Sequence, residues 1–214
     1  MYVPMQYRPP AGSWMVEIIR RNPFALLVTS GESATGPYVT HLPLIPKELP
    51  LNAGPDLLAG GVLLGHLNRA NPHWEALAGG TQSVLVFIGP NAYVSPTVYQ
   101  NDPAAPTWDY TAVHVHGVLR RIESREETMD VVQSTVRIFE AQFGAGWDMS
   151  GSIGYFDKLL PGVGAFQFTI SRAEGMFKLS QEQPADVRAA VQTHFSTHEA
   201  TGCRAVAELM ERLR

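Results

Sequence analysis

The spacing of apolar residues predicts a chain built mostly of strands. Apolar and β-branched residues form short runs, some continuous and some alternating with polar residues. Gly, Pro and Asn lie at the ends of these runs. Runs of about four to eight such residues are typical of β-strands. The expected strands cover residues 24–30, 38–45, 61–67, 83–89 with an extension at 92–95, 108–122 and 163–179.

Helices are predicted where apolar residues recur at intervals of three and four positions. A short helix carrying Trp14 and Ile18 ends at Asn22-Pro23, because a residue before proline disfavours the helical conformation. Further helices are expected over 124–142, near 155–160, from Gln183-Pro184 onward and at the end of the chain.

Two of these helices show a clear apolar stripe. In the last helix the stripe is narrow and fits packing on another surface, a second subunit included. The stripe residues are Met129, Val132, Val136 and Phe139 in the helix over 124–142, and Val206, Leu209, Met210 and Leu213 in the last helix.

About six strands with mostly short turns and helices at the edges predict an α+β fold. Its centre is an antiparallel β-barrel, and the helices are peripheral. No repeat, low-complexity tract or linker divides the 214 residues. We therefore expect one domain over residues 1–214, with a helical extension over about 184–214.

Composition narrows the function classes. A net charge of −4 and a pI near 6.0 disfavour a strong nucleic-acid surface, which usually needs clustered Lys and Arg. Cys203 is the single cysteine, so an intramolecular disulfide is excluded. The start lacks the pattern of a secretory signal, and no apolar stretch approaches the ~20 residues that span a bilayer. We expect a cytoplasmic protein with no membrane partner.

The stretch GHLNRANPHW, residues 65–74, is the first candidate for chemistry. A strand ends at His66-Leu67, Asn71 is suited to cap the next helix, and proline follows at a favourable position. The N–H groups at such a helix start bind anions, and the guanidinium of Arg69 adds a charge-assisted fork. The alternative is a plain helix cap with Arg69 solvated at the surface.

The stretch THLPL, residues 40–44, places a histidine in a strand. Thr40 and His41 point to opposite faces of that strand, so only one of them faces a given ligand. A strand histidine is more often packed or hydrogen-bonded in a core than bound to a ligand.

The stretch TWDYTAVHVHG, residues 107–117, holds two histidines one residue apart. Alternation puts His114 and His116 on one face, and Val113 and Val115 on the other, where they should fill the core. No carboxylate follows the pair at a useful spacing, so a metal would need His41 or His66 from another strand. We predict no metal site. Motifs of nucleotide-binding loops, serine hydrolases and zinc proteases are also missing from the sequence.

Seven motifs in order resemble the PaiB family, which is described as FMN-binding proteins and negative transcriptional regulators. The resemblance runs from Met1 to about residue 191. The motifs are MYVP, NPFALLVT, THLPL, GHLNRANPHW, GPNAYVSP, PTWDYTAVHVHG and EGMFKLSQ.

The resemblance implies a split β-barrel like that of pyridoxamine-phosphate oxidase and the flavin reductases. It also implies a homodimer with FMN at the interface between subunits. THLPL would lie near the flavin, GHLNRAN would hold the phosphate end, and KLSQ would reach toward the site. The cofactor-binding residues implied in this way are Thr40, His41, Leu42, His66, Leu67, Arg69, Asn71, Lys178, Ser180 and Gln181. The chain departs from the family pattern after KLSQ, where Glu182 replaces the usual Asn.

The resemblance favours a flavin-dependent sensor or regulator. The alternative is an FMN-dependent oxidoreductase or flavin reductase, in which His114, His116 or Tyr110 would be available for proton transfer. No catalytic residue is assigned. Haem, bound through His41, His66, His114 or His116, is the alternative cofactor. Direct DNA binding has weak support, because no helix-turn-helix is visible and the last helix mixes Arg with Glu.

Overall fold

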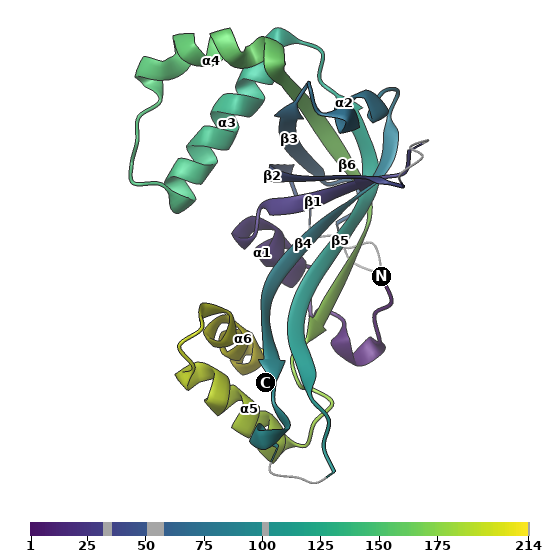
Figure 1. The fold of residues 1–214 in the computed structure, drawn as a ribbon, viewed down its shortest axis with the longest axis vertical. Coiled ribbons are helices and arrows are strands. Elements are labelled where there is room, and N and C mark those ends of the chain that lie inside the picture. Colours follow the sequence, from purple (N-terminus) through teal and green to yellow (C-terminus); the bar gives the residue numbers. More distant parts are fainter. Residues whose placement is uncertain (32–35, 51–57, 100–102, 214) are drawn as a thin grey trace. The chain divides into compact units, whose positions relative to one another are not determined.

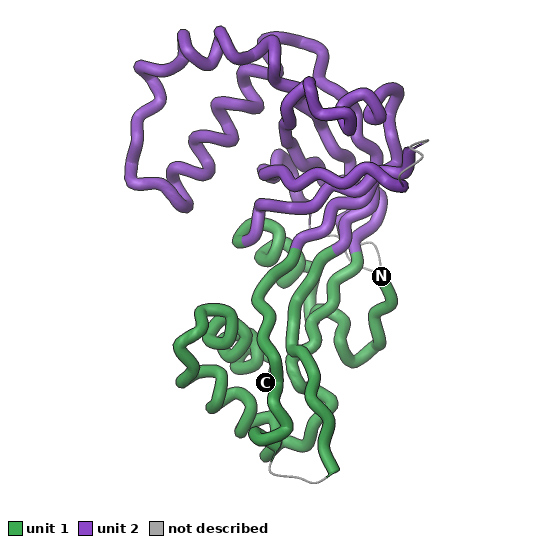
Figure 2. Tube along the Cα trace, viewed as in Figure 1, with its two compact units in different colours: residues 1–21, 88–113, 174–214 green, residues 22–87, 114–173 purple. Residues whose placement is uncertain are grey.

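The fold comes from a computed structural model that describes residues 1–31, 36–50, 58–99 and 103–213. Internal contacts divide the chain into two compact units (Figure 2). Unit 1 comprises residues 1–21, 88–113 and 174–214, and unit 2 comprises residues 22–87 and 114–173. The expected single domain with a C-terminal helical extension stays a prediction.

Six antiparallel strands form a closed barrel in the order β1-β2-β3-β6-β5-β4 (Figure 1), which confirms the predicted α+β barrel fold. The alternation of buried and exposed residues along each strand explains why they could be found from the sequence. Their bounds are β1 Phe24–Thr29, β2 Tyr38–Glu48, β3 Val62–Asn68, β4 Thr81–Val94, β5 Thr107–Arg121 and β6 Val163–Lys178.

The helices lie close to where the apolar spacing predicts them. Their bounds are α1 Gly12–Arg21, α2 Pro72–Ala76, α3 Arg125–Phe143, α4 Ile153–Leu159, α5 Ala185–Thr197 and α6 Thr201–Arg212. Pro184 precedes α5 as its N-cap residue. Within the described ranges, none of these helices has the length and apolar character needed to cross a membrane.

Strand β5 confirms the predicted division between core and outward residues. Val113 and Val115 are fully buried, whereas His114 and His116 are only half-buried. Strand β4 runs without a break from Thr81 to Val94, so it includes most of the predicted extension, and Gly89-Pro90 does not end the strand. These two residues shift the alternation instead, so that Asn91 is exposed and the strand continues to Val94.

In unit 2, α3 packs against β2 and β3. The consecutive residues Leu44 and Ile45 of β2 are both buried, as expected where a sheet has a core on one side and a helix on the other. The buried residues of α3 are Thr128, Val131 and Thr135, with the two hydroxyls bonded to carbonyls one turn earlier. The apolar stripe at 129, 132, 136 and 139 therefore lies about 100° round the helix from its buried side.

In unit 1, α6 packs against α5, and the stripe residues Val206, Leu209 and Met210 are buried, whereas Leu213 is half-buried. Arg212 of α6 forms two hydrogen bonds with the Glu17 carboxylate of α1, at 2.9 and 2.7 Å, and lies over the ring of Trp14. Most of the stripe of the last helix is thus covered within unit 1, and its packing on a second subunit stays a prediction.

Candidate functional site

A polar cluster forms in unit 2 where β2 meets α2. The Thr40 hydroxyl lies 2.8 Å from Nδ1 of His73 and accepts a hydrogen bond from Nδ2 of Asn71 at 3.2 Å. Oδ1 of Asn71 accepts from the backbone N–H of His73 at 2.9 Å, so Asn71 caps α2 as predicted. The fold thereby brings together Thr40 and Asn71, two of the residues implied by the sequence.

His73 is part of this cluster and was missed by sequence reasoning. Its side chain is 1% exposed, and its ring stacks on Tyr38 with centroids 5.4 Å apart. Burial lowers the pKa of His73, which keeps the imidazole neutral near pH 7. Its Nε2 has no hydrogen-bond partner. Nothing in the local sequence marks this histidine, because its position depends on how α2 folds against β2.

The backbone at the start of α2 has no donor left for an anion. Pro72 lacks an N–H, the N–H of His73 bonds to the Asn71 side chain, and the N–H of Trp74 bonds to the Asn71 carbonyl at 2.8 Å. An anion in this region would therefore depend on side chains, with arginine as the charged donor.

Two guanidinium groups lie against the ring of Trp74. Arg69 is 5.5 Å from the ring centroid and its Nε donates to the carbonyl of Val163 at 2.8 Å. Arg121 is 4.5 Å from the same centroid and donates to the Trp74 carbonyl. Gly164 permits this arrangement, because a Cβ there would lie 2.6 Å from the indole. Trp74 thus fixes two positive charges at one end of unit 2.

Several nitrogen atoms of unit 2 are buried without a hydrogen-bond partner. They are Nε of Arg121, Nδ1 of His66 and Nε2 of His73. Burial lowers the pKa of His66 as well, so it too is neutral near pH 7. Unpaired buried polar atoms cost stability in a fold that is otherwise well bonded, and they are expected where a ligand or ordered water binds.

The other residues of THLPL and GHL have different surroundings. The side chains of Leu42 and Leu67 are buried in the core, so only their backbone groups are available to a ligand. His41 is exposed and stacks on Phe24 with centroids 5.9 Å apart. Thr40 and His41 face opposite sides of β2, as the sequence predicts.

His41 belongs to an apolar surface that we call the β2–β1–β4 strip. The register places its members on one outer face, because Leu26 pairs with both His41 and Val86, and Val28 pairs with both Val39 and Val84. Of its apolar members, Phe24 and Val39 are the most exposed, at 65% and 53%. The strip consists of Phe24, Leu26, Val28, Val39, His41, Pro43, Val84 and Val86.

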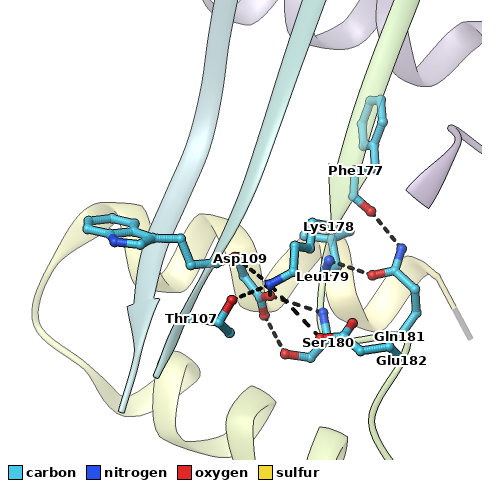
Figure 3. A network of polar contacts seen from close by, with 9 residues as sticks. Thr107, Asp109, Phe177, Lys178, Leu179, Ser180, Gln181 and Glu182 are labelled. Atoms are coloured by element: carbon cyan, nitrogen blue, oxygen red, sulfur yellow. Dashed lines mark hydrogen bonds and ion pairs between the residues drawn. The ribbon is translucent and has the colours of Figure 1, made fainter. Parts of the chain in front are cut away.

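The remaining implied residues form a separate network in unit 1 (Figure 3). The hydroxyl and the backbone N–H of Ser180 donate to the two carboxylate oxygens of Asp109, at 2.6 and 3.1 Å. Ser180 has a positive φ of 57°, an uncommon conformation for a residue with a side chain. The two bonds to Asp109 explain how this turn is held.

Lys178 and Gln181 are also bonded within the network. Nζ of Lys178 donates to the Trp108 carbonyl at 2.9 Å and to the Thr107 hydroxyl, and it lies 4.0 Å from the Asp109 carboxylate. The amide of Gln181 donates to the carbonyl of Phe177 at 2.6 Å and accepts from the N–H of Leu179. The polar atoms of this network largely satisfy one another.

Asp109 holds the network together and was missed by sequence reasoning. Its carboxylate is fully buried, and this burial raises its pKa to about 6 although Ser180 and Lys178 favour the charged form. A signal was available, because alternation along β5 places Asp109 on the same side as Val113. A carboxylate at a core position of a strand needs a hydrogen-bonding or charged partner, because an unpaired buried charge is costly.

The histidine pair of β5 lies on the outward side. Nη2 of Arg172 is 3.3 Å from Nε2 of His116. Among the described residues, no group of three or more His, Cys, Asp or Glu side chains is placed to hold a metal ion.

Comparisons with known proteins agree with this fold. Residues 1–172 match a family model described as "Putative FMN-binding domain". The Bacillus subtilis protein named Protease synthase and sporulation protein PAI 2 is 26% identical over 213 residues, which are 99% of this chain and 97% of that protein. A protein of Emericella nidulans named uncharacterized protein AN0679 is 28% identical over 215 residues, covering 85% of each.

Two solved structures share the architecture. The FAD and haem binding protein from Mycobacterium smegmatis has a TM-score of 0.58 at 14% identity, covering 86% of this chain and 79% of that one. The protein Rv2991 from Mycobacterium tuberculosis has a TM-score of 0.55 at 12% identity, covering 86% and 94%. At such identities the likeness shows the fold alone.

Proposed function

Because this chain belongs to the family of FMN-binding domains, we propose that it binds FMN in unit 2, beside the Thr40–Asn71–His73 cluster. The observation that carries this assignment is the pair of arginines fixed on Trp74 close to that cluster. The proposal takes up the residues implied by THLPL and GHLNRAN. It leaves out Lys178, Ser180 and Gln181, whose polar atoms are bonded within unit 1.

The residues of unit 2 fit the chemistry of FMN. The FMN phosphate is an anion, and Arg69 provides a positive charge whose described hydrogen bond uses only Nε. The flavin ring is flat and largely apolar, and the ring of Tyr38, which stacks on His73 and lies on the same side of β2 as Thr40, offers it an aromatic surface. Bound FMN would supply redox chemistry, and this chain would supply binding and orientation.

We also propose that the protein is a homodimer that covers the β2–β1–β4 strip. A contiguous exposed apolar surface on a sheet is a typical sign of a protein interface. The flavin would then lie at the edge of the interface, close to both subunits.

For the biological role we propose a flavin-dependent regulator or sensor. The support is the family shared with a relative whose name refers to protease synthase and sporulation. Among the described residues, no proton donor is assigned that would favour turnover of a substrate. Oxidation of NADH or NADPH by the FMN-loaded protein at enzymatic rates would contradict this role and favour the oxidoreductase.

The binding proposal is tested by titrating the purified protein with FMN and, separately, with riboflavin, which lacks the phosphate. Flavin fluorescence measures both affinities. We expect FMN to bind at micromolar concentrations and riboflavin to bind more weakly. Equal affinity for the two flavins would contradict a phosphate site at Arg69, and lack of binding by either would contradict the proposed function. An absorption spectrum of the purified protein separates flavin from haem.

A further inference from the structure

Helix α3 carries an apolar stripe that the described part of the chain leaves partly exposed. We call it the α3 seam. Met129, Val132, Val136 and Phe139 are only half-buried, and the last member, Phe143, is 58% exposed. The contrast with α6 is direct, because most of the stripe of α6 is buried within unit 1. The seam residues are Met129, Val132, Val136, Phe139 and Phe143.

The spacing of the α3 seam is that of a helix that packs along another helix. Its intervals are three, four, three and four residues, the heptad pattern in which apolar side chains of one helix fit between those of a second. Of the positions that flank such a seam, here 128, 133, 135, 140 and 142, only Glu140 carries a charge. Two copies of this seam can therefore approach each other with little repulsion.

The α3 seam borders the surface already proposed as an interface. Helix α3 packs on β2 and β3, and Ile45 is buried although it faces the outer side of β2. Pro43, two residues earlier on the same side, belongs to the β2–β1–β4 strip. The apolar outer face of β2 thus continues from the open strip to the part next to α3.

The area of the strip alone is too small for a stable dimer. Three strands about 4.8 Å apart and five residues long give an area of roughly 200 Å². A standard interface buries about 800 Å² per partner, of which roughly 60% is apolar. The α3 seam spans 15 residues from Met129 to Phe143, about 21 Å of helix, and adds roughly 200 Å². The two surfaces together approach the apolar area that such an interface needs.

We propose that the α3 seam packs against a second copy of this chain and completes the dimer interface begun by the β2–β1–β4 strip. This inference rests on the proposed homodimer. A second copy fits because the seam can pair with itself around a twofold axis. An anionic membrane surface is disfavoured, because α3 has four acidic and two basic residues.

The test compares Val136→Glu with Ala141→Glu in the full-length protein. Both add one negative charge to α3, but Val136 lies in the seam and Ala141 lies on the exposed side of the helix. Sedimentation equilibrium measures the dimer dissociation constant, and circular dichroism checks the fold. We expect Val136→Glu to weaken the dimer by at least ~100-fold, since it would bury an unpaired charge, and Ala141→Glu to leave the constant unchanged.

The outcomes separate this inference from the proposed function. If the wild type is a dimer and Val136→Glu is a dimer of the same affinity, the α3 seam is not part of the interface, although the homodimer stands. The same result is expected if the seam binds a different protein. A monomeric wild type overturns the homodimer and the seam together. If Val136→Glu does not fold, the same measurement on Phe143→Ser tests the seam. This substitution lies at the more exposed end of the seam, and it should still weaken the dimer by roughly 10-fold.

Discussion

The two clusters that contain the residues implied by the sequence differ in how their polar atoms are used. In unit 1, the side chains of Asp109, Lys178, Ser180 and Gln181 bond to each other and to nearby backbone. In unit 2, Arg121, His66 and His73 keep buried nitrogens without partners, and Arg69, which lies against the same indole as Arg121, has one described side-chain hydrogen bond. Among its described residues, unit 1 has one such buried atom, the hydroxyl of Tyr99, outside the hydrogen bonds of its network. A network that satisfies itself is a structural element, whereas unpaired donors indicate a place for a ligand.

The comparison also concerns charge. Unit 1 buries a carboxylate whose pKa is raised to about 6, so it is sensitive to pH near neutrality. Unit 2 buries histidines whose pKa is lowered, so they stay neutral over the same range. We therefore expect pH to act on the stability of unit 1 and to leave the charge of the unit 2 cluster unchanged.

The largest predicted effect concerns Asp109. Its folded pKa of about 6 lies above its ordinary value of 3.8, so the folded state holds the proton more tightly than the unfolded state. The contribution of Asp109 to the free energy of unfolding should therefore fall as the pH rises from about 4 to above 6, by about 3 kcal/mol. Asp109→Asn should remove this fall, because it cannot ionise and still accepts from Ser180. Urea unfolding of both proteins at several pH values measures the difference, and parallel curves would show that Asp109 does not titrate in this way.

The second prediction compares Arg69→Ala with Gln181→Ala. The first removes the positive charge proposed to bind the phosphate, and we expect FMN affinity to fall by roughly 10- to 100-fold with little change for riboflavin. The second removes two internal hydrogen bonds of unit 1 and should lower the stability by about 1–3 kcal/mol without changing FMN affinity. A loss of FMN affinity in Gln181→Ala would restore the role that the family resemblance gives to KLSQ.

The third prediction concerns Thr40, whose hydroxyl bonds to both Asn71 and His73. Thr40→Val keeps the shape of the side chain and removes a hydrogen-bond partner from the buried His73 and the half-buried Asn71, so we expect a loss of about 1–2 kcal/mol in the free energy of unfolding. Thr107→Val in unit 1 is the matched control, since its hydroxyl bonds to Lys178, which retains other partners. Thermal unfolding followed by circular dichroism should show the larger decrease for Thr40→Val.

The strands and the barrel could be predicted because alternation and bounding Gly and Pro residues are local signals. The cap at Asn71 was also local, and the structure confirms it. The buried side of α3 could not be predicted, because it depends on how the helix packs on β2 and β3 and not on its own apolar stripe. The role of His73 could not be predicted for the same reason, because it depends on how α2 packs against β2.

The implied site residues show a different limit of the sequence. A family resemblance places Arg69 and Lys178 in one site, but it does not show which of their donors are already bonded. The side chain of Arg69 has one described hydrogen bond, from Nε, and Nζ of Lys178 donates to two groups close to a carboxylate. Only the folded structure distinguishes these two situations, because the partners come from strands and turns far apart in the sequence.

The smallest predicted effect concerns the partly exposed ion pair of Glu17 and Arg212, which is compared with the buried carboxylate of Asp109 in the same unit. The hydrogen bonds from Arg212 lower the pKa of Glu17, so this pair stabilises the folded state at neutral pH and loses that effect as the pH falls. The pair is partly exposed, so Glu17→Gln should lower the free energy of unfolding by less than about 1 kcal/mol at pH 7, and less again in high salt. The pH slope of this pair is opposite in sign to that of Asp109. If Glu17→Gln removed the fall in stability between pH 4 and 6, the assignment of that fall to Asp109 would be wrong.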